Sequence, residues 1–224
     1  MSRFKPRSAF LLLLTASLCL NTALALELSG EFVQGGLVFG QAEEGERVFL
    51  DEKEVMVSMD GNFVIGFGRD ETGERTLRIR NPDGTDENLA MAIALRDYNI
   101  ERVDGLPPRT VTPDPEAAKR IKEEGAMVAS ARNRRDERTD YAAGFAWPAQ
   151  GRISGVYGSQ RVLNGEPRRP HFGLDIAAPT GSPVYAPASG IITLTHPDMY
   201  FSGGTIILDH GQGLSSTFLH LSKI

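Results

Sequence analysis

The stretch RRPHFGLDIAAP, residues 168–179, is the most informative part of this chain. From residue 171 to residue 176, apolar residues alternate with His171, Gly173 and Asp175. An extended strand would place the apolar side chains on one face and the imidazole and carboxylate together on the other. Glycine between them leaves space for both side chains to reach one ion, each about 2 Å away if the ion is zinc. The pattern therefore predicts that His171 and Asp175 are metal ligands.

The N-terminal 25 residues have the features of a secretory signal peptide. Three basic residues lie within the first seven, an apolar run covers 9–20, and residues 23–25 read Ala-Leu-Ala. The apolar run is too short for a membrane span. Cys19 follows a leucine, which argues against a lipid-modified cysteine. We therefore expect an exported protein in the periplasm or cell envelope, with no stable membrane insertion after the signal peptide is cleaved.

Composition narrows the chemistry of the exported chain. Removing residues 1–25 takes away the only cysteine and three basic residues, so the net charge falls from −5 to −8. Without cysteine, a metal must be held by His, Asp or Glu, and no disulfide framework can form. A protein this acidic is a poor binder of nucleic acid, and we predict no such partner.

Residues 26–104 are predicted to form a small antiparallel β-sandwich-like domain. Short apolar runs at 32–33, 37–39, 47–50, 55–57, 63–67, 77–79 and 89–95 are separated by turn residues. Such spacing is typical of short strands in a sandwich. The region has no histidine, so it is interpreted as a binding or spacer module rather than a catalytic one.

Residues 105–145 are predicted to be a linker that contains one helix. Residues 105–115 are rich in proline, and Asp114-Pro115-Glu116 resembles a helix start. The apolar stripe of this helix is thin, which favours a solvated connector. A segment that covers the active site until it is displaced is the alternative.

From residue 146 the chain is predicted to be an antiparallel β-sheet domain, and here a family resemblance enters. Residues 151–161, 171–175, 178–192, 204–213 and 218–222 resemble, in consistent order, the lysostaphin/LytM-type murein zinc metallopeptidases, metallopeptidase family 23. The resemblance covers about seventy residues, which is more specific than any single motif. It implies a zinc-dependent endopeptidase that hydrolyses peptide bonds in bacterial cell-wall peptidoglycan.

The resemblance also assigns roles to individual residues. It implies that His171 and Asp175 bind Zn²⁺ and that His220, in the motif His-Leu-Ser, assists catalysis. It further implies a third ligand in a His-x-His motif that would lie beyond Ile224, so we expect the sequence to be a fragment and the 146–224 domain to be incomplete. Without the resemblance, His220 would be interpreted as a packed strand residue.

The remaining candidates are less specific. Arg161 and Tyr200 are predicted to contact the peptidoglycan peptide substrate, although a solvated basic rim explains the exposed arginines near the first motif equally well. Residues 205–209 and 215–221 are predicted to form a hairpin that pairs His210 near Leu214 and His220 opposite Gly204. On this basis His210 is structural, and His196 is expected on an exposed loop.

An alternative function stays open at this stage. A non-catalytic homologue could have this fold and act by binding or activating other cell-wall hydrolases. Such proteins are expected to have lost zinc ligands, and the presence of both His171 and Asp175 argues for the enzyme.

Overall fold

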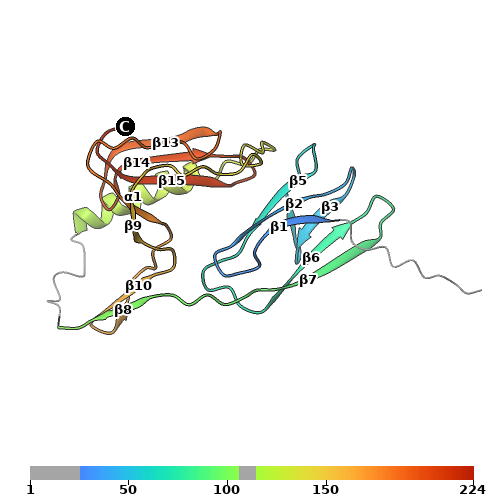
Figure 1. The fold of residues 1–224 in the computed structure, drawn as a ribbon, viewed down its shortest axis with the longest axis horizontal. Coiled ribbons are helices and arrows are strands. Elements are labelled where there is room, and N and C mark those ends of the chain that lie inside the picture. Colours follow the sequence, from blue (N-terminus) through green and yellow to red (C-terminus); the bar gives the residue numbers. More distant parts are fainter. Residues whose placement is uncertain (1–25, 106–114) are drawn as a thin grey trace, which may run out of the picture.

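The structure is a computed structural model that describes residues 26–105 and 115–224. The predicted signal peptide and most of the proline-rich linker lie outside these residues. The described chain consists mainly of short strands with one helix, which confirms the predicted fold class. In Figure 1 the sandwich strands lie to the right and the strands of the C-terminal part lie to the left.

Two antiparallel sheets form the N-terminal sandwich. One has the order β1-β2-β5 and the other the order β4-β3-β6-β7. The strands are β1 (Glu27–Gly30), β2 (Leu37–Gln41), β3 (Arg47–Leu50), β4 (Lys53–Val55), β5 (Asn62–Gly66), β6 (Glu74–Arg80) and β7 (Asp86–Ala92). The prediction that the first strand lies at 32–33 is wrong. Val33 makes only an isolated bridge to Ala94, and the first described strand is β1, at Glu27–Gly30.

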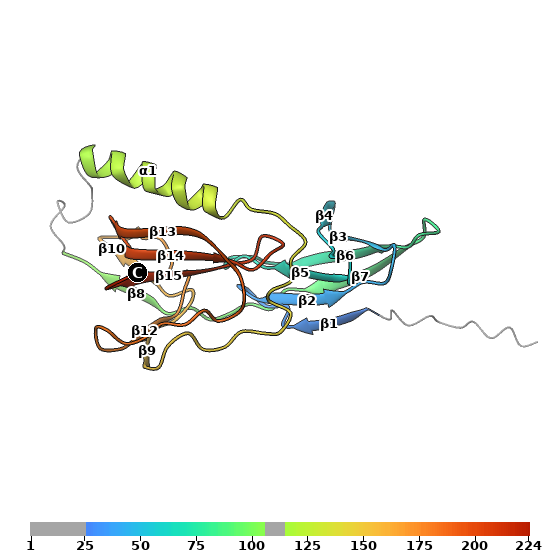
Figure 2. The same cartoon turned by 90° about the horizontal axis from the view of Figure 1, so that it is seen from above.

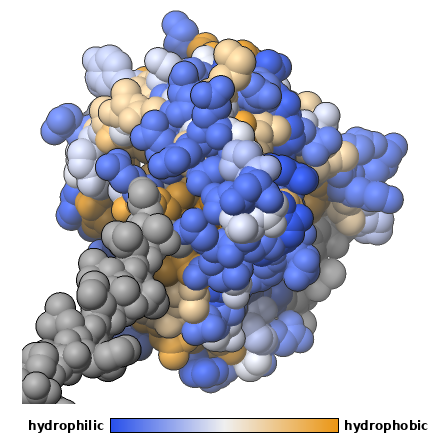
Figure 3. Space-filling view, turned by 90° about the vertical axis from the view of Figure 1, so that its right-hand side faces the viewer, coloured by the Kyte–Doolittle hydropathy of each residue, from blue (hydrophilic) through white to orange (hydrophobic). Residues whose placement is uncertain are grey.

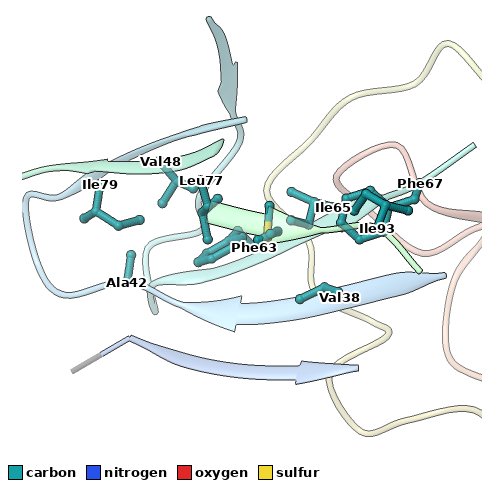
Figure 4. Close-up of a cluster of buried hydrophobic side chains, with 10 residues drawn as sticks. Val38, Ala42, Val48, Phe63, Ile65, Phe67, Leu77, Ile79 and Ile93 are labelled. Atoms are coloured by element: carbon teal, nitrogen blue, oxygen red, sulfur yellow. The ribbon is translucent and has the colours of Figure 1, made fainter. Parts of the chain in front are cut away.

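Alternation along these strands builds the core. Phe63 and Ile65 on β5 are 0% and 4% exposed, and Val38, Leu77 and Met91 from the neighbouring strands are fully buried. Figure 4 shows these side chains gathered between the two sheets. Burying each large apolar side chain contributes about 1.5–3 kcal/mol. The end of the sandwich turned toward the viewer in Figure 3 is mainly hydrophilic, as expected where strands alternate between core and solvent.

The chain leaves the sandwich through β8 (Ile100–Val103), which joins the C-terminal part. β8 pairs in parallel with β10 (Gln160–Leu163), and β10 pairs with β11 (Glu166–Pro167). Segments on either side of the helix thus share one sheet (Figure 1). This sheet was not predicted, because β8 is short and only its two end residues are apolar.

Two further sheets complete the C-terminal part. β9 (Arg152–Gly155) pairs with β12 (Asp175–Ala177), and β13 (Ile191–Met199), β14 (Gly203–Asp209) and β15 (Ser215–Leu221) form an antiparallel sheet. The predicted hairpin is confirmed: the His210 N–H donates to the Leu214 carbonyl at 2.8 Å. His196 lies on β13, not on a loop as predicted.

The single described helix, α1 (Pro115–Ala131), begins at the predicted proline and lies alongside β13 (Figure 2). Arg120 donates to the Asp198 carbonyl, and Glu124 Oε2 accepts the Tyr200 N–H at 2.7 Å. None of its residues is buried. Over the described residues, no helix combines the length and apolar character needed to cross a bilayer.

Between α1 and β9, the chain from 132 to 150 packs against the β14–β15 turn. Asp209 is buried, with a side chain 4% exposed, and it pairs with Arg138 and, at 3.5 Å, with Arg134. A buried carboxylate needs such partners because desolvation otherwise penalises its charge. Tyr141 is 3% exposed, and its hydroxyl donates to Gln212 Oε1 at 2.6 Å. Gln212 Nε2 in turn donates to the Asn62 carbonyl of the sandwich at 2.8 Å.

Candidate active site

Backbone carbonyl contacts set the orientation of the His171 ring. Nδ1 of His171 lies 3.1 Å from the carbonyl oxygen of Val156. A carbonyl oxygen only accepts, so this contact requires the proton on Nδ1. In the neutral ring, Nε2 therefore presents a bare lone pair.

Asp175 begins β12 opposite Gly155 on β9. The register shifts between Asp175 and Ile176, and such a bulge changes the direction in which the neighbouring side chain points. A Cβ at position 155 would lie 2.2 Å from Asp175 Oδ2, so the carboxylate occupies space that only glycine leaves open. Sequence reasoning did not identify Gly155, because a glycine carries no chemical signal of its own.

The two predicted metal ligands meet, although not on one strand as predicted. Asp175 Oδ1 lies 3.2 Å from His171 Nε2. Residues 171–174 are not part of a strand. The backbone of His171 bonds to a loop instead: its N–H donates to Ser159 O, and Gly158 N–H donates to His171 O. Phe172 and Leu174 are consequently 52% and 46% exposed rather than packed on one face.

This pair is chemically incomplete without a cation. With Nδ1 protonated, a neutral imidazole and a carboxylate face each other through two acceptor atoms 3.2 Å apart. A metal ion or a second ring proton would satisfy both. Two atoms each about 2 Å from one tetrahedral ion would be roughly 3.3 Å apart, so the separation fits a shared metal. Within residues 26–105 and 115–224, no group of three or more His, Cys, Asp or Glu side chains is placed to hold a metal ion.

His220 lies in a different sheet from Asp175. It is exposed on β15, where the register shifts: Leu221, not His220 as predicted, is opposite Gly204. At this irregularity, His220 has a φ of 59°, in the left-handed region. Its N–H donates to Ser202 O at 2.8 Å. Strained backbone at a non-glycine residue is common at functional sites. Among the described residues, no hydrogen bond or ion pair joins His220 to His171 or Asp175.

The two predicted substrate contacts, Arg161 and Tyr200, have partners other than His171 and Asp175. Arg161 Nε is 2.9 Å from Glu101 Oε2, in an exposed ion pair between β10 and β8. Tyr200 is 43% exposed in the turn between β13 and β14, edge-on to Phe201. Each side chain is accessible, and each already has a protein neighbour.

The other histidines have structural surroundings. His210 is fully buried, with Nδ1 2.6 Å from the Ser189 carbonyl and Nε2 2.7 Å from the Ser216 hydroxyl. Both ring nitrogens are thus engaged, which agrees with its predicted structural role. His196 Nδ1 accepts the Asp198 N–H at 3.1 Å.

Comparison with known proteins places this site in a family. Residues 169–224 match the family model described as Peptidase family M23. A crystal structure from Pseudomonas aeruginosa assigned to peptidase M23 superposes with a TM-score of 0.63 and 30% identity, over 87% of this chain and 75% of that chain. This chain belongs to peptidase family M23. The resemblance to lysostaphin/LytM-type enzymes is confirmed.

Curated relatives align over shorter regions. The peptidoglycan DD-endopeptidase ShyA of Vibrio cholerae is 40% identical over 57 residues, which is 25% of this chain and 13% of ShyA. The cell division protein DipM of Caulobacter vibrioides is 29% identical over 119 residues, 50% of this chain and 17% of DipM. The M23 chain thus matches about an eighth to a sixth of the length of these relatives.

Proposed function

We propose that this M23 protein is a zinc-dependent endopeptidase that hydrolyses peptide bonds in bacterial peptidoglycan. The observation that supports it is the approach of His171 Nε2 to Asp175 Oδ1, 3.2 Å apart, within the region that matches the peptidase family. ShyA, described as a peptidoglycan DD-endopeptidase, is similar over part of the same region. The substrate is the peptide portion of peptidoglycan, and the protein acts in the periplasm or cell envelope after its signal peptide, 1–25, is cleaved.

The proposed division of labour follows from the side chains. His171 and Asp175 would hold the metal, and an imidazole nitrogen with a carboxylate oxygen is a ligand pair that zinc accepts. A bound zinc ion would supply Lewis-acid polarisation of the scissile carbonyl. His220 moves a proton between the attacking water and the leaving amine. Arg161 and Tyr200 contact the substrate peptide, with Arg161 exchanging Glu101 for a substrate carboxylate. Residues 26–104 form an accessory domain, 105–145 the linker and 146–224 the peptidase domain.

Metal content and turnover of full-length variants test this proposal. His171→Ala and Asp175→Ala should lose zinc and peptidoglycan hydrolysis together. His220→Ala should keep its zinc and its melting temperature and lose about 10²–10⁴-fold in kcat, the usual effect of removing an acid–base group. His196→Ala is the matched control, because His196 lies on β13, where its Nδ1 accepts the Asp198 N–H, and it should behave as wild type. Unchanged zinc in His171→Ala would contradict the metal assignment.

A second candidate is a non-catalytic homologue that binds or activates other cell-wall hydrolases. It is supported by the similarity, over 50% of this chain, to DipM, which is described as a cell division protein and not as a peptidase. Peptidoglycan binding and stimulation of another hydrolase by a full-length protein with no zinc and no turnover would support this role.

A further inference from the structure

A buried arginine of the sandwich bonds to the loop that holds His171. Arg69 lies between β5 and β6 and is 8% exposed. Its Nε and Nη2 atoms both donate to the carbonyl oxygen of Gly158, at 2.9 and 2.6 Å. Two charged donors on one buried acceptor form a strong contact, because charge-assisted hydrogen bonds are roughly twice as strong as neutral ones.

The arginine is itself fixed by the sandwich. Its guanidinium carbon lies 4.3 Å from the centre of the Tyr98 ring, and the Tyr98 hydroxyl donates to the Arg69 carbonyl at 3.0 Å. Nη1 also pairs with Asp70 at 2.5 Å. A guanidinium held within the sandwich by stacking on Tyr98 and by the Asp70 carboxylate cannot readily follow the loop if the loop moves.

The loop fits against the sandwich too closely to be displaced without cost. Gly158 has a φ of 85°, and a Cβ at that position would lie 2.0 Å from the Tyr98 ring. The Tyr157 ring of the loop also leaves no room for a Cβ on Gly35 of the sandwich, which would lie 2.3 Å away. Loop 156–159 thus packs closely against the Tyr98 side chain and the Gly35 backbone of the sandwich.

The same loop holds His171 through three backbone groups. Gly158 N–H donates to His171 O at 2.7 Å, and His171 N–H donates to Ser159 O at 2.8 Å. The Val156 carbonyl contacts the ring at Nδ1, 3.1 Å away. These groups lie within one or two residues of the Gly158 carbonyl that accepts from Arg69. The loop therefore fixes both the backbone and the ring of His171.

We propose that Arg69 is a positioning residue for the metal site, through which the N-terminal sandwich holds loop 156–159 and with it the His171 ring. The sandwich is then a structural part of the peptidase site and not a spacer. This inference rests on the proposed function of His171 as a metal ligand.

Paired variants of the full-length protein separate this role from general stability. Arg69→Met keeps the aliphatic stem and removes both donors to Gly158. Arg75→Met is the matched control: Arg75 also makes two charged contacts, to Asp51 and Glu71, but both partners lie within the sandwich. Arg69→Lys keeps the charge and allows one hydrogen bond in place of two.

The measurements are amide hydrogen exchange of the metal-free protein and zinc affinity by competition with a chelator. In Arg69→Met, the amides of Gly158 and His171 should exchange at least tenfold faster, and zinc affinity should fall about 10–100-fold, as for other residues that orient ligands. Arg69→Lys should show a smaller loss in both. Arg75→Met should change neither by more than about twofold, although its melting temperature also falls.

The outcomes are distinguishable from a failure of the proposed function. If wild type binds zinc and Arg69→Met keeps its exchange rates and affinity, Arg69 has no positioning role. If Arg69→Met does not fold, Arg69→Lys decides the question. Wild-type amide exchange rates and wild-type zinc affinity in Arg69→Lys would show that Arg69 has no positioning role. If the wild type binds no zinc, the proposed function fails, while faster exchange at Gly158 and His171 would still report the contact with the sandwich.

Discussion

At the scale of single residues, the candidate site depends on backbone groups and on a glycine, which no sequence motif identifies. His171 is oriented by three backbone groups of loop 156–159 rather than by a side chain, so no second motif marks its partners. The pairing of His171 with Asp175 could be predicted from their spacing. The role of Gly155 could not be predicted from the sequence, because this glycine only leaves space for the Asp175 carboxylate.

Gly155→Ala should therefore disable the site without changing any ligand. The new Cβ would lie 2.2 Å from Asp175 Oδ2 and 2.9 Å from its Cγ, so the carboxylate must move away from His171. We expect zinc affinity of the full-length protein to fall at least tenfold, since metal sites tolerate ligand displacements of only about 0.2 Å. Titration with zinc against a competing chelator measures this loss.

Gly125→Ala is the control for this substitution. Gly125 lies within α1, and a Cβ there meets nothing within 4 Å. Alanine should leave zinc affinity unchanged and should stabilise the helix by up to about 1 kcal/mol. Full zinc affinity in Gly155→Ala would show that Asp175 does not need its present position to bind metal.

At the scale of elements, periodicity predicted most strands but not where their regularity breaks. Strands β2, β3, β5, β6 and β7 of the sandwich and the β14–β15 hairpin follow from alternation and turn residues. The register shift near His220 does not, because a bulge adds one residue without changing the apolar pattern, and His220 is therefore displaced by one position. The strand predicted over 171–176 begins only at Asp175, and the backbone of His171 bonds to loop 156–159 instead of to a neighbouring strand.

The segment from 132 to 150 carries a testable pH dependence through Tyr141. Burial raises the pKa of this phenol from 10.0 to about 12. A tyrosine whose folded pKa is raised stabilises the protein fully below its unfolded pKa, and this contribution is lost as pH rises from about 10 to about 12. We expect the free energy of unfolding to fall by about 2 kcal/mol across that window. Denaturant unfolding at a series of alkaline pH values, with tyrosinate absorbance recorded in parallel, measures both effects.

Tyr141→Phe isolates the contribution of this one hydroxyl. The variant should lose about 1 kcal/mol at neutral pH because the bond to Gln212 disappears. Its stability should then decline less than that of wild type between pH 10 and 12. An identical alkaline decline in both proteins would assign the effect to other groups.

At the scale of the whole molecule, the sequence predicts the parts better than their assembly. Alternating strands in 26–104 and the ordered motifs from 151 onward identify two β-rich regions, because each signal is local. Besides the pairing of β8 with β10, the regions are joined by single residues far apart in sequence, such as Arg69 with Gly158 and Gln212 with Asn62. Neither contact belongs to a periodic pattern, so the close association of the two regions emerges only from the structure.

This association predicts that the two regions unfold together. Gln212 joins them, since its side chain donates to Asn62 O of the sandwich and accepts from Tyr141. Gln212→Ala leaves the buried Tyr141 hydroxyl without its acceptor and removes one of the two bonds to Asn62 O, which still accepts the Ser58 N–H. It should lower the free energy of unfolding by about 1–2 kcal/mol. If the regions form one cooperative unit, native-state hydrogen exchange should report the same loss at core amides of β3 and of β14.

Gln41→Ala is the matched control, because it removes a single exposed bond to Asp60 O within the sandwich and should cost less than about 0.5 kcal/mol. A loss confined to β14 in Gln212→Ala would show that the sandwich unfolds independently of the C-terminal part.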